Sequence, residues 1–454
     1  MSGPPLGRGL VGVALDHLAP FVAAPEAKRL LVAGLSPGAG AVLIDEPAIA
    51  LCSSAVSPRC ALLGGFERDT GRGTAALAPR LALWALEEPT LAGGIPLNGF
   101  VSMHLGAGIA AIDRPGLPVT WLFGLDHPSW FGDRLAAAVG ATRAAVALSG
   151  THLALIGGIA DSFFTFAVDH AAVAFRFGAI VSEHSLDSTI ERTLTADPAA
   201  VAKAVRALQS AAGGRVTTNA RDLELGAACY LALRDEAASI GADALAVSDW
   251  PEFQERLGIH PGMAFSWLDE HDGIPVACEG DVLGGLSMVA LRALSGLGAA
   301  LLDIATVHPD SGSALLWHCG GSPLHLADSA GVRWTPHSTL GRNTPGARVM
   351  GAVADLTFAP GPVTVARLDR DGRRLFAFEA TVLDAADSPG PGFDGTRGWV
   401  AAFRTLGGEP RSLGQIIGSA LDHAVDHHLV LTPGSHGRAL AEWGRGAGVD
   451  LLPL

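Results

Sequence analysis

Two acidic residues, Glu279 and Asp303, stand at the ends of short apolar runs and lie 24 positions apart. Glu279 follows Ile274-Pro-Val-Ala-Cys, and Asp303 closes the run Ala299-Ala-Leu-Leu-Asp. Apolar runs of this length are typical of buried strands. In open α/β sheets the ligand crevice lies beyond the carboxyl ends of the strands. The pattern therefore predicts an α/β fold in which the two carboxylates line such a crevice.

Histidines are placed near apolar runs in a similar way. A further apolar run, Ala314-Leu-Leu-Trp, ends at His318, and a doublet, His427-His428, comes far downstream. Carboxylate and imidazole groups are ligands for divalent cations. The chain is therefore expected to hold a metal ion.

Composition excludes several partners. The chain of 454 residues is 49% hydrophobic and 17% charged, which predicts two or three domains with extensive cores. The net charge of −14 leaves no basic stripe for nucleic acid and disfavours anionic membrane surfaces. The uncharged stretch 144–160 contains Ser, Thr, His and Gly residues, which argues against a membrane span. The N-terminus shows no signal pattern, so a cytoplasmic protein is expected.

Five cysteines without a C-x-x-C pair indicate free thiols in a reducing compartment. Cys278 and Cys319 adjoin Glu279 and His318, and each is interpreted as a small buried thiol, with a thiolate ligand as the alternative.

The first region, 1–150, alternates short apolar runs with Ala-rich stretches, which predicts a mostly parallel α/β domain. We expect strands at 119–123 and 145–148 and a helix from Asp133 between them. The Gly-rich segment 36–41 lacks a full G-x-G-x-x-G, so a dinucleotide site is not expected.

A second α/β domain, 151–300, carries Glu279. Strands are expected from Leu153 and over 242–247, and helices over 199–212, 222–240 and 282–294. Asp281 is interpreted as the N-cap of the last helix. The third region, 301–454, carries Asp303, His318 and His428. A hairpin over 363–383 with its turn at Asp371-Gly372 predicts a β-rich barrel or sandwich.

Several segments together resemble the L-fucose/L-arabinose isomerase superfamily, and the shorter fucose isomerase-like members most closely. They are Asp249-Trp250-Pro251, the run 277–288, Leu302-Asp303, the run 316–321 and His427-His428. The resemblance extends from about residue 150 to the C-terminus. It implies an α/β fold of two Rossmann-like domains followed by a C-terminal β-barrel-like domain. It also implies a homo-oligomer, often a hexamer with sites shared between subunits, and an aldose–ketose isomerase that uses a divalent cation, usually Mn²⁺.

Applied to this sequence, the resemblance implies that Glu279 and Asp303 are the acidic pair that ligates the metal and moves protons. It does not indicate which of the two acts first as the base. His428 corresponds to the histidine ligand, with His427 as its alternative. His318 is an additional ligand or a substrate contact. Trp317 and Trp250 are either core residues or walls that stack on a sugar. Asp249 stands where many short relatives have cysteine.

The chemistry expected of such a site is proton transfer between neighbouring carbons of a monosaccharide through a cis-enediolate. A divalent cation stabilises the charge that develops on two oxygens, while one carboxyl group acts as base and another as acid. The chain is shorter than true fucose isomerases, so the sugar is left open.

Three alternatives follow. One is an isomerase of a sulfonated hexose such as sulfoquinovose, giving 6-deoxy-6-sulfofructose, with Arg292, Arg342 or histidines binding the anionic tail. Another is a non-catalytic sugar-binding protein. The third is a zinc hydrolase built on His423 and His427, whose spacing on a helix would place both rings on one face.

Overall fold

The computed structural model describes residues 31–33, 39–45, 48–52, 66–69, 74–77, 80–85, 87–88, 90–94, 99–113, 118–124, 127–341 and 348–454. The chain divides into two compact units, Met1–Ser149 with Arg438–Gly448, and Gly150–Gly437 with Val449–Leu454. The finer division into three domains remains a prediction. Arg342 and residues 36–38 of the Gly-rich segment lie outside the described residues. None of the described helices combines the length and the hydropathy needed to cross a membrane.

The first unit contains a five-stranded sheet in the order β1-β3-β2-β6-β7. Its strands are β1 (Leu31–Ala33), β2 (Ala39–Asp45), β3 (Ala48–Cys52), β6 (Arg80–Ala85) and β7 (Val119–Phe123), with a separate hairpin of β4 (Phe66–Asp69) and β5 (Thr74–Leu77) and helices α2 (Gly99–Asp113) and α3 (Gly132–Leu148). The strand expected at 119–123 is confirmed. The strand expected at 145–148 is wrong, because these residues form the last turn of α3 and the chain turns only at Ser149.

The second unit contains a four-stranded sheet in the order β11-β10-β8-β9, and every pair in it is parallel. The strands are β8 (His152–Ile156), β9 (Ile180–His184), β10 (Ala244–Val247) and β11 (Val276–Ala277). The sequence order of the strands reverses between β8 and β10. In parallel sheets the loops beyond such a reversal enclose the usual ligand crevice.

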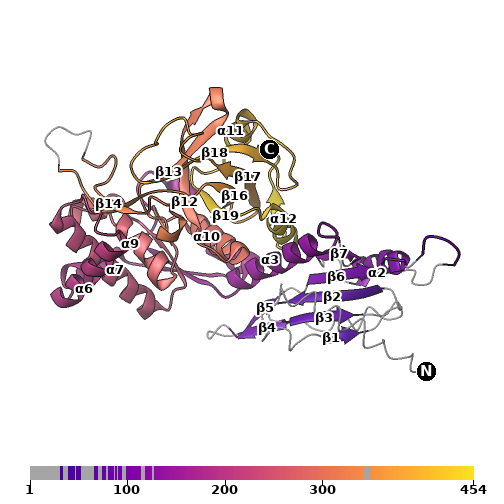
Figure 1. The fold of residues 1–454 in the computed structure, drawn as a ribbon. Helices are drawn as coiled ribbons and strands as arrows, with labels where there is room; N and C mark the ends of the chain where they lie inside the picture. The colour runs from indigo at the N-terminus through magenta and orange to yellow at the C-terminus, as the bar shows by residue number, and fades with distance from the viewer. Residues whose placement is uncertain are drawn as a thin grey trace. The chain divides into compact units, whose positions relative to one another are not determined.

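Several helices of this unit begin at polar caps, and the cap predicted at Asp281 is confirmed. Asp197 and Asn219 accept backbone N–H groups at the starts of α6 (Pro198–Ala211) and α7 (Ala220–Ile240), and Asp281 accepts the Gly284 N–H at the start of α10 (Val282–Ser295). The remaining helical segments are η3 (Phe164–Phe166), α4 (His170–Phe177), α5 (Leu186–Leu194), α8 (Glu252–Arg256), α9 (Gly262–Trp267) and η4 (Leu268–Asp272). Figure 1 shows α6 and α7 side by side.

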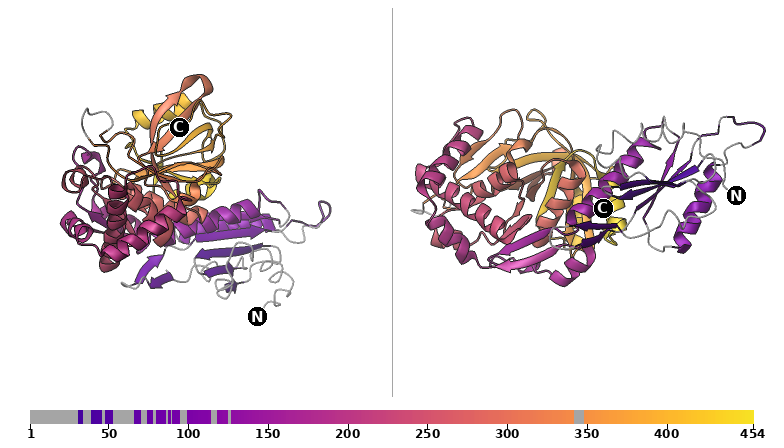
Figure 2. Two further views of the ribbon diagram at one scale, coloured as in Figure 1. Left: turned by 60° about the vertical axis from the view of Figure 1, so that its left-hand side comes forward. Right: turned by 90° about the horizontal axis from the view of Figure 1, so that it is seen from below.

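A closed barrel of six strands follows in the same unit, and Figure 2 shows its orange to yellow strands in two further views. Around the ring the order is β12 (Ala300–His308), β13 (Ser313–His318), β18 (Thr396–Arg404), β17 (Arg374–Val382), β16 (Gly361–Asp369) and β19 (Leu429–Pro433). Pairing of β17 with β18 closes the ring. Shorter elements of this unit flank it: η5 (Pro309–Ser311), η6 (Leu324–Leu326), β14 (Arg333–Thr335), β15 (Val353–Thr357), α11 (Leu413–Asp422) and β20 (Asp450–Leu451). Helix α12 (Gly437–Gly446) belongs almost entirely to the first unit.

The expected hairpin is confirmed as β16 and β17. Its turn residues Asp371 and Gly372 have φ values of 58° and 72°, a left-handed conformation that Asp tolerates and Gly adopts freely. Helix α10 contacts both the parallel sheet and the barrel, which lie on either side of it. It therefore fixes the carboxyl end of β11 next to the barrel strands β12 and β19.

Candidate active site and cation-binding cluster

Glu279 is held by its backbone in the loop after β11. Its N–H donates to Asp249 Oδ1 at 2.7 Å, and its carbonyl accepts the Ala160 N–H at 3.1 Å. The next residue, Gly280, donates to the Val247 carbonyl at 3.0 Å. Glu279 has φ 59°, an unfavourable conformation for a residue with a side chain. The loops after β8, β10 and β11 therefore meet here and impose a strained backbone on this carboxylate.

Asp303 and His428 are brought together by strand register. In the antiparallel pair of β12 and β19, Leu302 lies opposite Leu429. The next position along both strands places Asp303 opposite His428. The distance from His428 Nε2 to Asp303 Oδ1 is 4.0 Å, and to Glu279 Oε2 it is 3.4 Å. The structure thus brings Glu279, Asp303 and His428 to one point, as the sequence predicts.

His427 also reaches this point. Its Nε2 lies 3.2 Å from Glu279 Oε2, and the ligand atoms of Glu279, His427 and His428 all lie within 4.8 Å of one another. Phe166 stacks on both imidazoles, with ring centroids 5.1 Å and 5.0 Å away. His428 is fully buried, whereas the side chain of His427 is 43% exposed. His428 is therefore the more rigidly placed ligand of the doublet.

A buried ionic network orients His428. Its Nδ1 lies 3.0 Å from Asp281 Oδ2, and Asp281 forms a bidentate pair with Arg367. All three side chains are fully buried, and Arg367 Nη2 also reaches Asp426 Oδ2 at 3.3 Å. Because a carboxylate only accepts hydrogen bonds, His428 keeps a proton on Nδ1, and its Nε2 is the atom that faces Glu279 and Asp303.

The charges of this network shift the pKa values of its members. Burial opposes the charged form of Asp281, but Arg367 and His428 outweigh it and lower the pKa of Asp281 well below its usual range. Burial also lowers the pKa of His428, while the hydrogen bond to Asp281 and the charge of Asp303 raise it, with a net increase. Asp281 is therefore a firmly ionised partner for the imidazole.

Asp303 is the least satisfied of the carboxylates. Its Oδ1 is buried and has no hydrogen-bond partner among the described residues. Burial raises the pKa of Asp303 above its ordinary value, and the nearby His428 opposes this shift. A buried acceptor of this kind fits a cation, because an ion would supply the missing positive partner. Oxygen atoms from two carboxylates with one imidazole nitrogen suit a hard or borderline divalent ion.

His318 lies behind this cluster, between two thiols. Its Nε2 is 3.1 Å from Cys278 Sγ, and its Nδ1 is 3.2 Å from Cys319 Sγ. Burial lowers the pKa of His318 well below 6.5, so the ring is neutral. Burial raises the pKa of both thiols, which therefore remain protonated. The thiols are free, as the sequence predicts.

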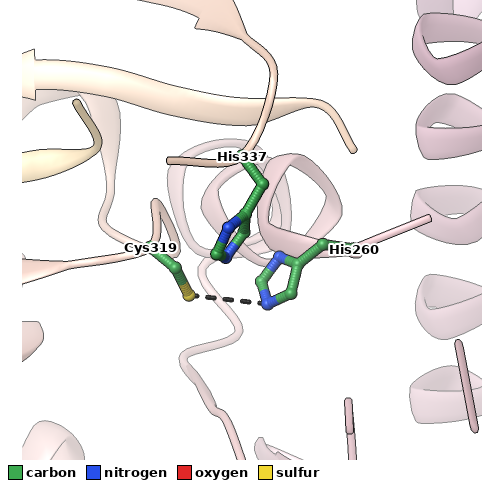
Figure 3. Close-up of side chains that lie close together, drawn as sticks. All are labelled: His260, Cys319 and His337. Carbon is green, nitrogen blue, oxygen red and sulfur yellow. Dashed lines mark hydrogen bonds between the residues drawn. The ribbon is translucent and has the colours of Figure 1, made fainter. Parts of the chain in front are cut away.

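A second histidine–thiol group adjoins the first. His260, Cys319 and His337 lie close together, with Cys319 Sγ 3.5 Å from His260 Nε2 (Figure 3). His260 Nε2 also lies 3.0 Å from Asp249 Oδ2, the same carboxylate that accepts the Glu279 N–H. Asp249 thus links this group to the backbone of Glu279.

The two tryptophans differ in their position. Trp317 lies opposite Asp303 in the β12–β13 ladder, so both side chains project from the same face, and its Nε1 donates to the Asp394 carbonyl at 2.9 Å. Trp250 is 39% exposed, and no contact given for the described residues joins it to Glu279, Asp303 or His428. The geometry favours Trp317 over Trp250 as a wall beside the carboxylates.

Other predicted groups lie elsewhere. Helix α11 ends at Asp422, so His423 and His427 do not share a helix face, and His423 Nδ1 lies 2.9 Å from the Ser419 carbonyl instead. Arg292 forms an ion pair with Asp269. A cavity of about 690 Å³ opens among α6, α7 and α8. It is lined by apolar side chains with Arg206, Arg221, Arg256 and Glu224, and it contains none of the cation ligands above.

Sequence reasoning missed the Asp281–Arg367 pair and the role of Asp281 beside His428. One signal was present, because Arg367 interrupts an otherwise apolar strand run, and a buried charge requires a partner. The partner itself stands 86 residues away, with no local pattern that identifies it.

Comparison with known proteins gives relatives of one kind. No family model matches the chain. The sulfoquinovose isomerases of Priestia aryabhattai and Alkalicoccus urumqiensis are each 25% identical to it, over 66% of this chain and 66% of their own length. That of Clostridium sp. (strain MSTE9) is 25% identical over 54% of this chain and 55% of its own. The chain thus matches somewhat less than two thirds of the length of these relatives. They are sugar isomerases by name, in agreement with the isomerase expected from the sequence.

Proposed function

We propose that the chain is a metal-dependent aldose–ketose isomerase that acts on a monosaccharide. The observation that carries the proposal is the convergence of Glu279 Oε2 and Asp303 Oδ1 on His428 Nε2, at 3.4 Å and 4.0 Å. These three residues are the proposed cation ligands, and Glu279 and Asp303 are also the proposed acid–base pair. The names of the relatives support the reaction class independently.

The residues present fit a divalent cation, for which Mn²⁺ is the proposed identity. The fit rests on the unpaired Oδ1 of Asp303 and on the Nε2 lone pair that Asp281 directs toward the carboxylates. When bound, such a cation stabilises the negative charge that develops on two neighbouring substrate oxygens.

The chain's own groups move the protons. A carboxylate takes the proton from the carbon next to the aldehyde, and a carboxyl group returns a proton to the former carbonyl carbon. In the same reaction, the proton of the neighbouring hydroxyl group moves to the former carbonyl oxygen. Glu279 and Asp303 both lie near His428 Nε2, at 3.4 Å and 4.0 Å, and are proposed to serve the two ends of this exchange. Positioned acid–base groups of this kind contribute about 10²–10⁴-fold each.

For the substrate, we propose a sulfonated hexose, with sulfoquinovose converted to 6-deoxy-6-sulfofructose. The support is the name shared by the three relatives compared. Recognition of a sulfonate tail requires N–H or guanidinium donors near the sugar. Of the two arginines expected to supply them, Arg292 pairs with Asp269, and Arg342 lies outside the described residues. We further propose a homo-oligomer, which light scattering of the purified protein tests directly.

The test compares carboxyl variants of the Mn²⁺-loaded protein on sulfoquinovose and on neutral aldoses. We expect Glu279→Gln and Asp303→Asn each to lower kcat/KM by about 10²–10⁴-fold. Glu255→Gln and Asp310→Asn replace exposed carboxylates and serve as controls. Full activity in either site variant would refute the assigned roles. Turnover of neutral aldoses alone would refute the sulfonated substrate, and metal-independent sugar binding without turnover would support a binding protein instead.

A further inference from the structure

The protein contains two groups that each combine one thiol with two imidazoles. The first is Cys278, His318 and His428, and the second is His260, Cys319 and His337. In each, the candidate ligand atoms lie within 4.8 Å of one another. Thiolate and imidazole together favour thiophilic ions such as Zn²⁺ and Cd²⁺ over hard cations. What separates the two groups is the hydrogen bonding of their rings, which decides whether a lone pair or a proton faces the thiol.

In the first group the hydrogen bonds at Nδ1 allow the ring nitrogens that face Cys278 to serve as lone-pair donors. His428 donates its Nδ1 proton to the Asp281 carboxylate at 3.0 Å, which leaves the Nε2 lone pair 3.6 Å from Cys278 Sγ. A ligating histidine usually donates its other N–H to a carboxylate in this way. The neutral ring of His318 has the Cys319 sulfur beside Nδ1, so a proton placed there leaves Nε2 as a lone pair 3.1 Å from Cys278.

In the second group the rings carry the opposite tautomer. His260 Nδ1 accepts the Gly262 N–H at 3.1 Å, and His337 Nδ1 accepts the N–H groups of Thr339 and Leu340 at 3.1 Å each. A backbone N–H only donates, so each ring presents its lone pair at Nδ1 and carries a proton on Nε2. His260 Nε2, the atom that points at Cys319 in Figure 3, donates to Asp249 at 3.0 Å. A cation at this thiol would therefore meet N–H protons instead of lone pairs.

We propose that Cys278, His318 and His428 form a binding site for a thiophilic divalent cation, and that the group around Cys319 does not. As the metal–sulfur bond forms, the thiol of Cys278 releases its proton to solvent. The two imidazoles bind through Nε2, and a proton held on either Nε2 is released to solvent as the metal–nitrogen bond forms. His428 belongs both to this site and to the proposed isomerase site, so the two ions exclude each other. The binding itself does not depend on the proposed function; only the resulting inhibition of turnover rests on it.

The test is a Cd²⁺ titration of the metal-free protein, followed by the ultraviolet sulfur-to-cadmium charge-transfer band. Wild type is expected to give a band that Cys278→Ser and Cys278→Ala lose. Removal of a residue that only hydrogen-bonds to a metal ligand lowers metal affinity by about 10–100-fold. Removal of the Cys278 thiol should lower the affinity for Cd²⁺ by more than this. Cys319→Ser and Cys229→Ser are the matched controls and should keep the band. Cys52 and Cys60 are present in every variant, so their contribution cancels in the comparison.

Two outcomes overturn the proposal: a full band in folded Cys278→Ser, or loss of the band in Cys319→Ser. The second decides the matter even if both Cys278 variants fail to fold, which circular dichroism reports. Excess Mn²⁺ should raise the apparent Kd for Cd²⁺, since His428 is shared, and an unchanged Kd would refute the overlap. Because the band does not require turnover, its presence in a protein without isomerase activity would leave this inference intact.

Discussion

Replacing Asp281 by Asn isolates the buried charge that supports the site. Asn is as good an N-cap as Asp, so the hydrogen bond from Gly284, now 2.8 Å long, is expected to persist. What is lost is the negative partner of the fully buried Arg367, and removal of one member of a buried pair costs about 3–5 kcal/mol. Asp426 remains 3.3 Å from Arg367 Nη2, so we expect the lower end of this range, about 3 kcal/mol.

Urea unfolding followed by tryptophan fluorescence measures this loss as a lower midpoint at unchanged slope. Asp197→Asn is the matched control, because it makes the same change at the exposed N-cap of α6 and should stay within about 0.5 kcal/mol of wild type. Isothermal titration should also show Mn²⁺ affinity reduced by about 10–100-fold. If Asp281→Asn unfolds at the wild-type urea concentration, the assigned role of the buried pair is wrong.

The same pair predicts a pH dependence. The pKa of Asp281 is lowered in the folded protein, so its stabilisation is present above the ordinary Asp value of about 3.9 and is lost as the pH falls toward the folded value. The difference between wild type and Asp281→Asn should therefore narrow as the pH falls below about 4. A difference that grows in acid would contradict this sign.

Three further changes test the backbone and the carboxylates. Glu279→Gly should be more stable than Glu279→Ala by about 1–2 kcal/mol in urea, because φ 59° costs a residue with a Cβ; equal midpoints would rule out the strain. The pKa of Asp303 is raised in the folded protein, so the stability of the metal-free wild type should fall as the pH rises above about 4. In Asp303→Asn this contribution is absent, so the urea midpoint should change less between about pH 4 and 7. A Cβ at Gly280 would lie 2.3 Å from the Gly158 carbonyl oxygen, so Gly280→Ala should cost about 2–4 kcal/mol. Gly214 also has a positive φ but open space around it, so Gly214→Ala should lower the free energy of unfolding by only about 1–2 kcal/mol. Equal losses in Gly280→Ala and Gly214→Ala would contradict the close contact at Gly280.

The sequence was most informative where local chemistry decides the structure. The cap Asp281 and the turn Asp371-Gly372 specify the start of their helix and their hairpin without help from distant residues. The run 145–148 fits a strand and a buried helix end equally well, and packing within the first unit decided for the helix. Whether the β-rich region is a barrel or a sandwich depends on the pairing of β17 with β18, which no local signal specifies.

The candidate site divides in the same way. Glu279 and Asp303 are recognisable because each ends an apolar run, and His428 is recognisable through the resemblance carried by the His427-His428 doublet. The tautomers of His260, His337 and His428 could not be predicted, because each depends on a hydrogen bond made only after folding. Asp281 reads locally as a helix cap, and its second role becomes visible only with Arg367 beside it.

The closed ring of strands has a consequence for how the protein can change. Every strand in it has a neighbour on each side, so no single strand can slide along its axis without displacing the whole cycle. Asp303 and His428 lie at the ends of the neighbouring barrel strands β12 and β19, so their spacing is fixed by the pairing of these strands. Glu279 lies in the loop after β11, which belongs to the separate parallel sheet. Changes in the surrounding loops that accommodate another sugar would therefore leave His428 and Asp303 in place. Only the position of Glu279 would change with them.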